Sequence, residues 1–262
     1  MKEELKRVFV SPFFFLSFGF MFLCFLGYSL PAWVYSVGIE MEYRESAFQL
    51  SIGAIFFGSV MMFMPFCAAA SHAVKQVDEM RSSMLHWRVY RSSISRYAMI
   101  KMAGSAISAA CSTALAFACH AVLWNIIALP VDPLTYPGHE IGWAETCLYG
   151  KWYLIAHGLP VYVWMTFGIA FSAAIWAIVA LAVAVWIPDR LLVISVPSCI
   201  YYLWHLQLPY ILFGINTQHP GTLYNDALTV KSAVECIITY IVVLIISICI
   251  YITGLRRRIC NV

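Results

Sequence analysis

Six apolar runs dominate the chain and limit what it can fold into. The hydrocarbon core of a bilayer is about 30 Å thick, and a helix rising about 1.5 Å per residue needs about 20 apolar residues to cross it. Runs of about that length or more occupy residues 12–34, 50–71, 99–129, 157–187, 191–213 and 233–254. They predict six transmembrane helices, and hence an all-α, polytopic membrane protein.

The composition favours the same fold class. Only 11% of the 262 residues are charged and 62% are hydrophobic, whereas a soluble domain carries about 25% charged residues. The net charge of +3 is interpreted as a topology signal, so no nucleic-acid partner is expected. No internal repeat or low-complexity tract divides the chain, and residues 1–262 are predicted to form one transmembrane domain.

The cations indicate how the predicted spans are oriented. Six spans place both termini on one side of the membrane. With the termini in the cytoplasm, thirteen of the sixteen cations lie in cytoplasmic segments, as the positive-inside rule requires. These thirteen are Lys2, Lys6, Arg7, Lys75, Arg81, Arg88, Arg91, Arg96, Lys101, Arg190, Arg256, Arg257 and Arg258. We therefore expect a multi-pass protein of the plasma membrane with both termini in the cytoplasm.

The N-terminus, MKEELKRVF, precedes an apolar run that lacks a cleavage site, so we expect it to be retained. Leu5, Val8 and Phe9 recur at helical spacing with charges between them. This pattern predicts a short interfacial helix over residues 2–10, with an ordinary charged tail as the alternative.

The nine cysteines form no CxxC pair, and most of them lie inside apolar runs. In such positions cysteine behaves as a small hydrophobic residue. We expect packing thiols, and neither a disulfide framework nor a metal site.

The most charged interval of the chain separates the second and third runs. It reads VKQVDEMRSSMLHWRVYRSSISRYAMIKM, with apolar residues at positions 77, 80, 84 and 87. This spacing predicts an amphipathic cytoplasmic helix over residues 77–88, whose exposed apolar stripe would meet the membrane surface or another protein. Ser93 and Ser95 offer N-cap oxygens for the helix that follows. Between the fourth and fifth runs the turn is only three residues long, Pro188–Asp189–Arg190.

The order of these parts resembles the permease subunits of ABC-2-type transporters, which export drugs, peptides, lipids and glycans. The family shares an N-terminal interfacial helix, six spans, a charged helix after span two and a very short turn after span four. In the family, the loop after span two reads acidic residue, Gly-Thr, leucine-rich turn, Pro, Ser-Arg, then Lys. The matching residues here are Glu79, Met84-Leu85, Ser95-Arg96 and Lys101. Ser82-Ser83 replaces the Gly-Thr, and Ser93 or a neighbour replaces the Pro.

The resemblance implies that the helix over residues 77–88 couples the spans to a separate ATPase by docking into a cleft on it. The residues carried over to this contact are Asp78, Glu79, Arg81, Met84, Trp87 and Arg88. The resemblance also implies two ATPase subunits, which bind ATP and Mg²⁺, and a second permease, identical or homologous. A helix lying on the membrane surface with solvated charges is the alternative.

No motif for ATP hydrolysis or covalent catalysis is found in the chain. Gly150-Lys151 lacks the upstream glycine and following hydroxyl of a phosphate loop, and His139-Glu140 lacks the second histidine of HExxH. There is no GxSxG motif. The chain is therefore not expected to be an enzyme by itself or to bind a cofactor, and ATP hydrolysis is expected on the partner.

Polar and adaptable side chains within the runs are candidates for a substrate pathway. In the family the fifth span borders the pathway, and Tyr201, His205 and Pro209 would share one helical stripe here. The candidate pathway residues are Tyr201, Trp204, His205, Met61 and Met64. Packing between helices is the alternative for all five, and for His120 we favour a hydrogen bond to a neighbouring helix. Pro65 is expected to kink the second span.

These features favour the permease of an ATP-driven exporter of a hydrophobic or amphipathic compound, such as a peptide antibiotic, a drug or a lipid-like molecule. Two alternatives stay open. One is a non-transporting sensor or immunity protein that binds an antimicrobial peptide, and the other is an intramembrane enzyme that uses His205 or His120.

Overall fold

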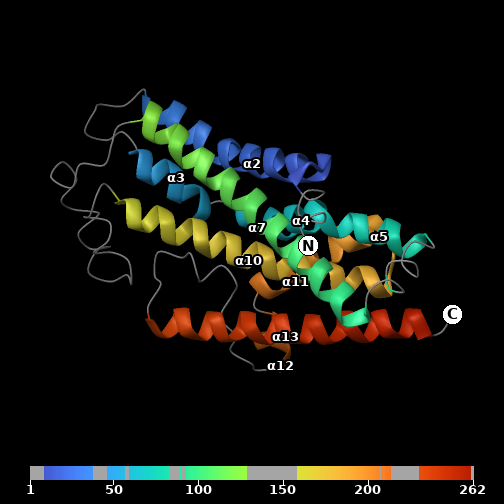
Figure 1. Cartoon of the computed structure of the whole chain (residues 1–262). Coiled ribbons are helices and arrows are strands. Elements are labelled where there is room, and N and C mark those ends of the chain that lie inside the picture. Colours follow the sequence, from blue (N-terminus) through green and yellow to red (C-terminus); the bar gives the residue numbers. More distant parts are fainter. Residues whose placement is uncertain are drawn as a thin grey trace.

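Helices make up the regular secondary structure of the chain's computed structural model (Figure 1). The described residues are 9–37, 46–56, 59–82, 89, 93–128, 158–206, 208–213 and 230–260. No strand occurs among them, so the predicted all-α class is confirmed for these parts of the chain. Residues 2–8 of the predicted interfacial helix and the predicted external loop at 131–156 lie outside the described residues.

Among the described residues, four helices are long and apolar enough to cross a bilayer. They are α2 (Pro12–Val37), α7 (Ile94–Ile127), α10 (Leu159–Trp186) and α13 (Val230–Cys260). They coincide with the first, third, fourth and sixth apolar runs, so the chain is a helical, membrane-embedded protein. At the start of α7, the Ser93 hydroxyl accepts a hydrogen bond from the Arg96 backbone N–H at 3.3 Å, which confirms the predicted cap.

The second apolar run is not the single span predicted over residues 50–71. It is divided into α3 (Ala47–Phe56), the 3₁₀ helix η2 (Ser59–Phe63), α4 (Met64–Ala68) and the π-helix η3 (Ala69–Ala73), which continues into α5 (Val74–Arg81). The parts before and after residues 57–58 meet at 51° and together could form a fifth crossing. Pro65 stands in the first turn of α4, where its missing N–H breaks no hydrogen bond.

The fifth apolar run is also divided. Helix α11 (Arg190–His205) has 16 residues, about 24 Å of helix, which is shorter than a bilayer core of about 30 Å. Helix α12 (Leu208–Phe213) follows, with Pro209 as its second residue. The predicted stripe of Tyr201, His205 and Pro209 is therefore wrong, because α11 ends at His205 and Pro209 belongs to the next helix.

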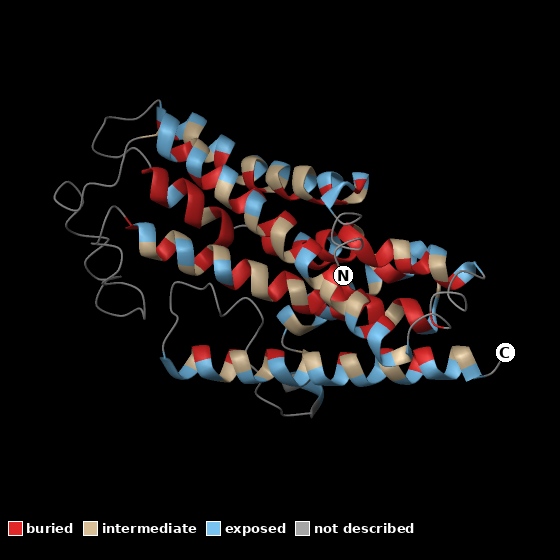
Figure 2. Ribbon diagram, in the orientation of Figure 1, coloured by how far each residue is buried: buried red, intermediate tan, exposed pale blue. Residues whose placement is uncertain are grey.

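Helix α10 is the centre of the bundle (Figure 1). It packs against α7, α13, α11, α4, η3 and α5. Figure 2 shows that its second half is buried on nearly every side, and the residues from Ile175 to Leu181 are all buried. A helix that is apolar all round belongs in such a position. By contrast, α13 buries one face and leaves the apolar residues Val234, Ile238 and Ile245 at least half exposed.

One end of the bundle collects the described cations. We call it the α5 end, formed by residues 74–82, 93–101, 185–190 and 254–260. Of the nine Lys and Arg residues in the described segments, Lys231 lies at the opposite end. The other eight lie at the α5 end: Lys75, Arg81, Arg96, Lys101, Arg190, Arg256, Arg257 and Arg258.

At the α5 end, α13 approaches the last turn of α10 very closely. A Cβ atom on Gly254 would lie 2.6 Å from Val185 Cγ1 and 2.7 Å from Trp186 Nε1. Four residues later, the Arg258 guanidinium donates hydrogen bonds to the carbonyl oxygens of Val185 and Trp186. A cation there is favourable, because the last carbonyls of a helix have no partner within the helix.

We expect Gly254→Ala to destabilise the protein by about 1–3 kcal/mol, because the added methyl forces α13 away from α10. The midpoint of thermal unfolding in detergent measures the effect. Gly27→Ala is the matched control, since a Cβ on Gly27 meets nothing within 4 Å and alanine is favoured over glycine in a helix by about 0.5–1 kcal/mol. Equal midpoints for the two variants would contradict the close approach.

Candidate functional site: the polar cluster around helix α5

Helix α5 is packed into the bundle and does not lie free on its surface. Val74, Val77 and Met80 are buried, and Val77 and Met80 belong to a core shared with α7, α10 and α13. The expectation of an exposed apolar stripe at positions 77, 80, 84 and 87 is therefore wrong for its first two residues. Residues 84 and 87 lie outside the described residues. The buried face of α5 fixes the directions in which its polar side chains point.

A buried ion pair joins α5 to α7. Lys101 Nζ lies 2.7 Å from Glu79 Oε1, and the two side chains are 3% and 13% exposed. The Tyr97 hydroxyl donates to the other carboxylate oxygen, Glu79 Oε2, at 2.9 Å. Transfer of a charge from water into a protein interior costs several kcal/mol, and a partner at hydrogen-bond distance offsets most of that cost.

Gln76 extends this cluster to α13. Its side-chain amide nitrogen, Nε2, donates to the Tyr97 hydroxyl at 3.0 Å and to the Tyr251 hydroxyl at 3.4 Å. All three side chains are buried. Gln76 and Glu79 both bond to Tyr97 of α7, and Gln76 also bonds to Tyr251 of α13. Helix α5 is thereby joined to two long helices that are far apart in the sequence.

Two exposed ion pairs join α5 to the turn between α10 and α11. Arg190 Nη2 lies 2.7 Å from Asp78 Oδ1, and Arg81 Nη2 lies 3.3 Å from Asp189 Oδ2. Arg81 Nε also donates to the Pro188 carbonyl oxygen at 2.7 Å. Asp189 has a second role, because its other oxygen accepts the first backbone N–H groups of α11 as an N-cap.

The residues predicted to contact an ATPase are thus divided into two groups. Asp78, Glu79 and Arg81 are described, and each is bonded to another part of the same chain. Asp78 and Arg81 remain about half exposed, whereas Glu79 is turned inward. Met84, Trp87 and Arg88 lie outside the described residues. Any force applied to α5 would act on α7, α13 and the α10–α11 turn through these contacts.

The predicted pathway residues lie elsewhere. Met61, Met64 and Tyr201 are buried in the main hydrophobic core, and Trp204 packs against that core while half-buried. The Tyr201 ring meets the Trp176 ring edge-on, with centroids 5.4 Å apart. His205 is exposed at the end of α11. Four of the five are therefore packing residues of one core, whereas His205 is exposed.

A polar contact deep in the bundle was only half foreseen from the sequence. His120 Nε2 of α7 lies 2.8 Å from the Ser29 hydroxyl of α2, and the Trp124 indole N–H lies 2.9 Å from each of these atoms. The favoured reading of His120 as a hydrogen bond to a neighbouring helix is confirmed. Ser29 and His120 are both fully buried, so their contact joins helices and presents no accessible nucleophile. Ser29 had no sequence signal, since many serines face lipid or a neighbouring helix.

We expect Lys101→Met to destabilise the protein by about 3–5 kcal/mol, because it leaves the Glu79 carboxylate buried without its cation. The double variant Lys101→Met with Glu79→Met should regain most of that loss, since apolar residues can replace a buried pair at little cost. Thermal unfolding of the single and double variants forms the measurement.

Lys231→Met is the control for this cycle, because the Lys231 side chain is 87% exposed and lies 3.9 Å from Glu235. Its effect should stay within about 1 kcal/mol. If the destabilisation of the double variant equals the sum of those of Lys101→Met and Glu79→Met measured separately, Glu79 and Lys101 do not act as a pair.

A scan against protein-family models, a search of curated proteins and a search of solved structures each found no match. The function of the chain is therefore inferred from its own residues and their geometry.

Proposed function

We propose that the chain is the permease subunit of an ABC-2-type exporter, driven by ATP hydrolysis on a separate subunit. In this proposal α5 and the residues that follow it, to position 88, form the segment that couples to the ATPase. The single helix predicted over residues 77–88 is wrong, because α5 ends at Arg81 and Ser82 is extended. Asp78, Arg81, Met84, Trp87 and Arg88 contact the ATPase, and Glu79 transmits the movement inward. ATP and Mg²⁺ bind to the partner and not to this chain.

The observation that carries the proposal is the attachment of α5 to three other parts of the bundle. Within two turns, α5 is bonded to Lys101 and Tyr97 on α7, to Tyr251 on α13, and to the turn at residues 188–190. A helix that only lies on a membrane surface needs no such contacts. A helix that converts a push from another protein into movement of the spans needs them, because the displacement must reach several of the spans.

The distribution of charge supports the proposed orientation. Cations are retained on the cytoplasmic side of membrane proteins, and the α5 end carries all of the described cations except Lys231. We therefore propose that the α5 end faces the cytoplasm, with both termini there. Six spans result if the bent run from Ala47 to Arg81 and the α11–α12 pair each count as one.

The proposed assembly contains two permeases, identical or homologous, and two ATPase subunits in the plasma membrane. Its cargo is a hydrophobic or amphipathic compound, in keeping with the apolar surface of the spans. Transport requires that the two access states bind the cargo with different affinities, because otherwise ATP-driven switching does no work on a gradient.

Affinity purification of the full chain from its native membrane tests the proposal. We expect an ATPase with a phosphate loop to co-isolate in a mild detergent and to hydrolyse ATP faster in the complex than alone. Purification of the chain without any ATPase, while it still binds an antimicrobial peptide, would favour the sensor alternative and overturn the permease.

Arg190→Gln tests whether the α10–α11 turn takes part in coupling. It removes the partner of Asp78 but leaves every side chain of α5 in place, and loss of an exposed pair costs at most about 1 kcal/mol. We expect the ATPase still to co-isolate, while ATP-driven uptake of a fluorescent amphipathic dye into inside-out vesicles falls about two- to thirty-fold, the range for residues that carry coupling.

Arg256→Gln is the matched control, since Arg256 is exposed at the same end and its substitution removes the same charge. Arg190→Lys should restore part of the uptake. Equal uptake for the Arg190→Gln and Arg256→Gln variants would show that the turn is not a coupling contact.

Labelling of single cysteines tests the orientation. In a background with all nine native cysteines replaced, since Cys119, Cys199, Cys249 and Cys260 are exposed, Ser82→Cys at the end of α5 should react with a membrane-impermeant maleimide only after the cells are permeabilised. Val230→Cys at the start of α13, where the native side chain is 63% exposed, should react in intact cells. Reaction of Ser82→Cys in intact cells would place the α5 end outside and exclude an ATPase contact there.

A further inference from the structure

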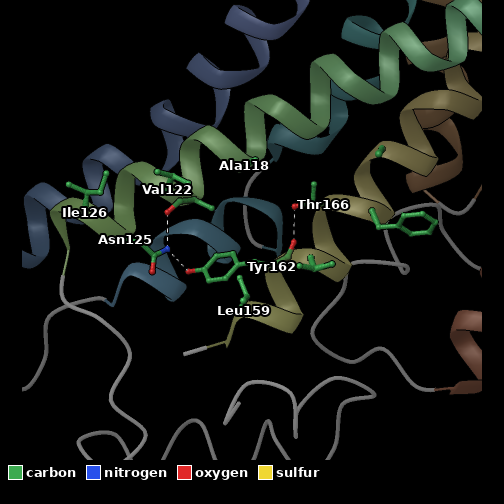
Figure 3. A pocket seen from close by; sticks show the side chains of 11 residues that line it. Ala118, Val122, Asn125, Ile126, Leu159, Tyr162 and Thr166 are labelled. Carbon is green, nitrogen blue, oxygen red and sulfur yellow. Dashed lines mark hydrogen bonds between the residues drawn. The ribbon is translucent and has the colours of Figure 1, made fainter. Parts of the chain in front are cut away.

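A groove of about 700 Å³ lies between α7 and α10 at the end of the bundle opposite α5 (Figure 3). Residues 118–126 of α7 and 159–170 of α10 form its two walls. Three alanines, Ala118, Ala121 and Ala170, leave the space between the helices open. A volume of this size is typical of sites that hold a small molecule, which run to about 300–1,000 Å³.

The edges of the groove are apolar and exposed. Val122, Val163 and Phe167 stand at its edges and are 59%, 62% and 66% exposed. These residues lie within two helices that are long and apolar enough to span the membrane. Neither wall contains an Asp, Glu, Lys or Arg residue. The chemistry of the groove therefore matches a hydrocarbon chain, and an ionic ligand would find no partner in it.

One end of the groove is polar. The Asn125 side-chain N–H donates to the Ala121 carbonyl oxygen at 2.8 Å and to the Tyr162 hydroxyl at 3.2 Å. Figure 3 shows this amide and hydroxyl facing one another across the groove. Asn125 is close to the last residue of α7, and Tyr162 is in the first turn of α10. The polar pair thus lies near the helix ends, where the headgroup region of a bilayer meets its hydrocarbon core.

The length of the groove fits one leaflet. From the polar pair to the far end of the groove, residues 162 to 170 of α10 span about 12 Å, which lies within the thickness of half a bilayer core, about 15 Å. We propose that the groove holds one acyl chain of a bilayer phospholipid. The glycerol-ester region lies at Asn125 and Tyr162, and the end of the chain lies beside Ala118 and Ala170. This site does not depend on the proposed transport function.

A phosphatidylethanolamine with a diazirine in its acyl chain tests the site. The full chain is reconstituted with this lipid, extracted into a mild detergent, freed of loosely held lipid by detergent exchange, and then irradiated. Peptide mass spectrometry locates the adducts. After detergent exchange we expect adducts on residues 118–126 and 159–170. Adducts on residues 234–246 of α13, which form no part of the groove, should disappear.

Ala118→Leu and Ala170→Leu fill the groove from opposite walls, so misfolding of one variant leaves the other as a test. Each excludes about two buried methylene groups of the lipid, which should lower the retained adducts about tenfold. Asn125→Leu should lower them as well, because it removes the polar contact. Gly19→Leu is the control, since a Cβ on Gly19 meets nothing within 4 Å, and it should retain the adducts.

Three results would overturn the proposal. The first is loss of the groove adducts as rapidly as those on α13, which indicates ordinary exchangeable lipid. The second is that both alanine variants fold and retain the parent level of adducts. The third is chemical cross-linking of the groove to residues 129–157 or to a second copy of the chain, which would identify a protein segment as its occupant.

Discussion

The buried contact between Glu79 and Lys101 is the constraint on which the arrangement of the α5 end depends. A carboxylate and an ammonium that are nearly removed from water are stable only with their partner at hydrogen-bond distance, and here that distance is 2.7 Å. Helices α5 and α7 must therefore hold their relative position closely. Tyr97 completes the contact by donating to the second carboxylate oxygen, and Gln76 extends it to Tyr251. A helix that the sequence presents as amphipathic and free becomes a fixed part of the bundle.

The irregular backbone that precedes α5 has the same physical logic. In an apolar environment, carbonyl groups that leave the regular helical pattern need other donors. The Ser17 hydroxyl of α2 donates to the Cys67 carbonyl oxygen at 2.8 Å, just before the π-helix η3. Because 3₁₀ and π segments concentrate at places where helices bend or serve a function, this region is where a displacement of α5 would be absorbed before it reached α3. The break and the attachments of α5 thus complement each other in the proposed coupling.

Helix α10 connects two ends of very different character. Its second half lies under α5 and is buried on nearly every side, and its last carbonyls are held by Arg258 of α13. Its first half diverges from α7 and leaves the open, uncharged groove at Asn125 and Tyr162. At the groove end, the contact of Ser29, His120 and Trp124 holds α2 to α7. Short polar contacts therefore fix the charged end, while small side chains leave an open groove at the other end.

The sequence by itself determined the class of protein, four of the spans, the cap at Ser93 and the gathering of cations at one end. These follow from hydrophobic length, local hydrogen bonding and charge, which are properties of neighbouring residues. It could not show that Val77 and Met80 face the core, that Glu79 points inward to Lys101, that His120 meets Ser29, or that α11 stops at His205. Only the tertiary structure decided these, because each depends on which distant helix lies alongside. An amphipathic stripe records that a helix has an apolar side, but only packing decides what covers that side.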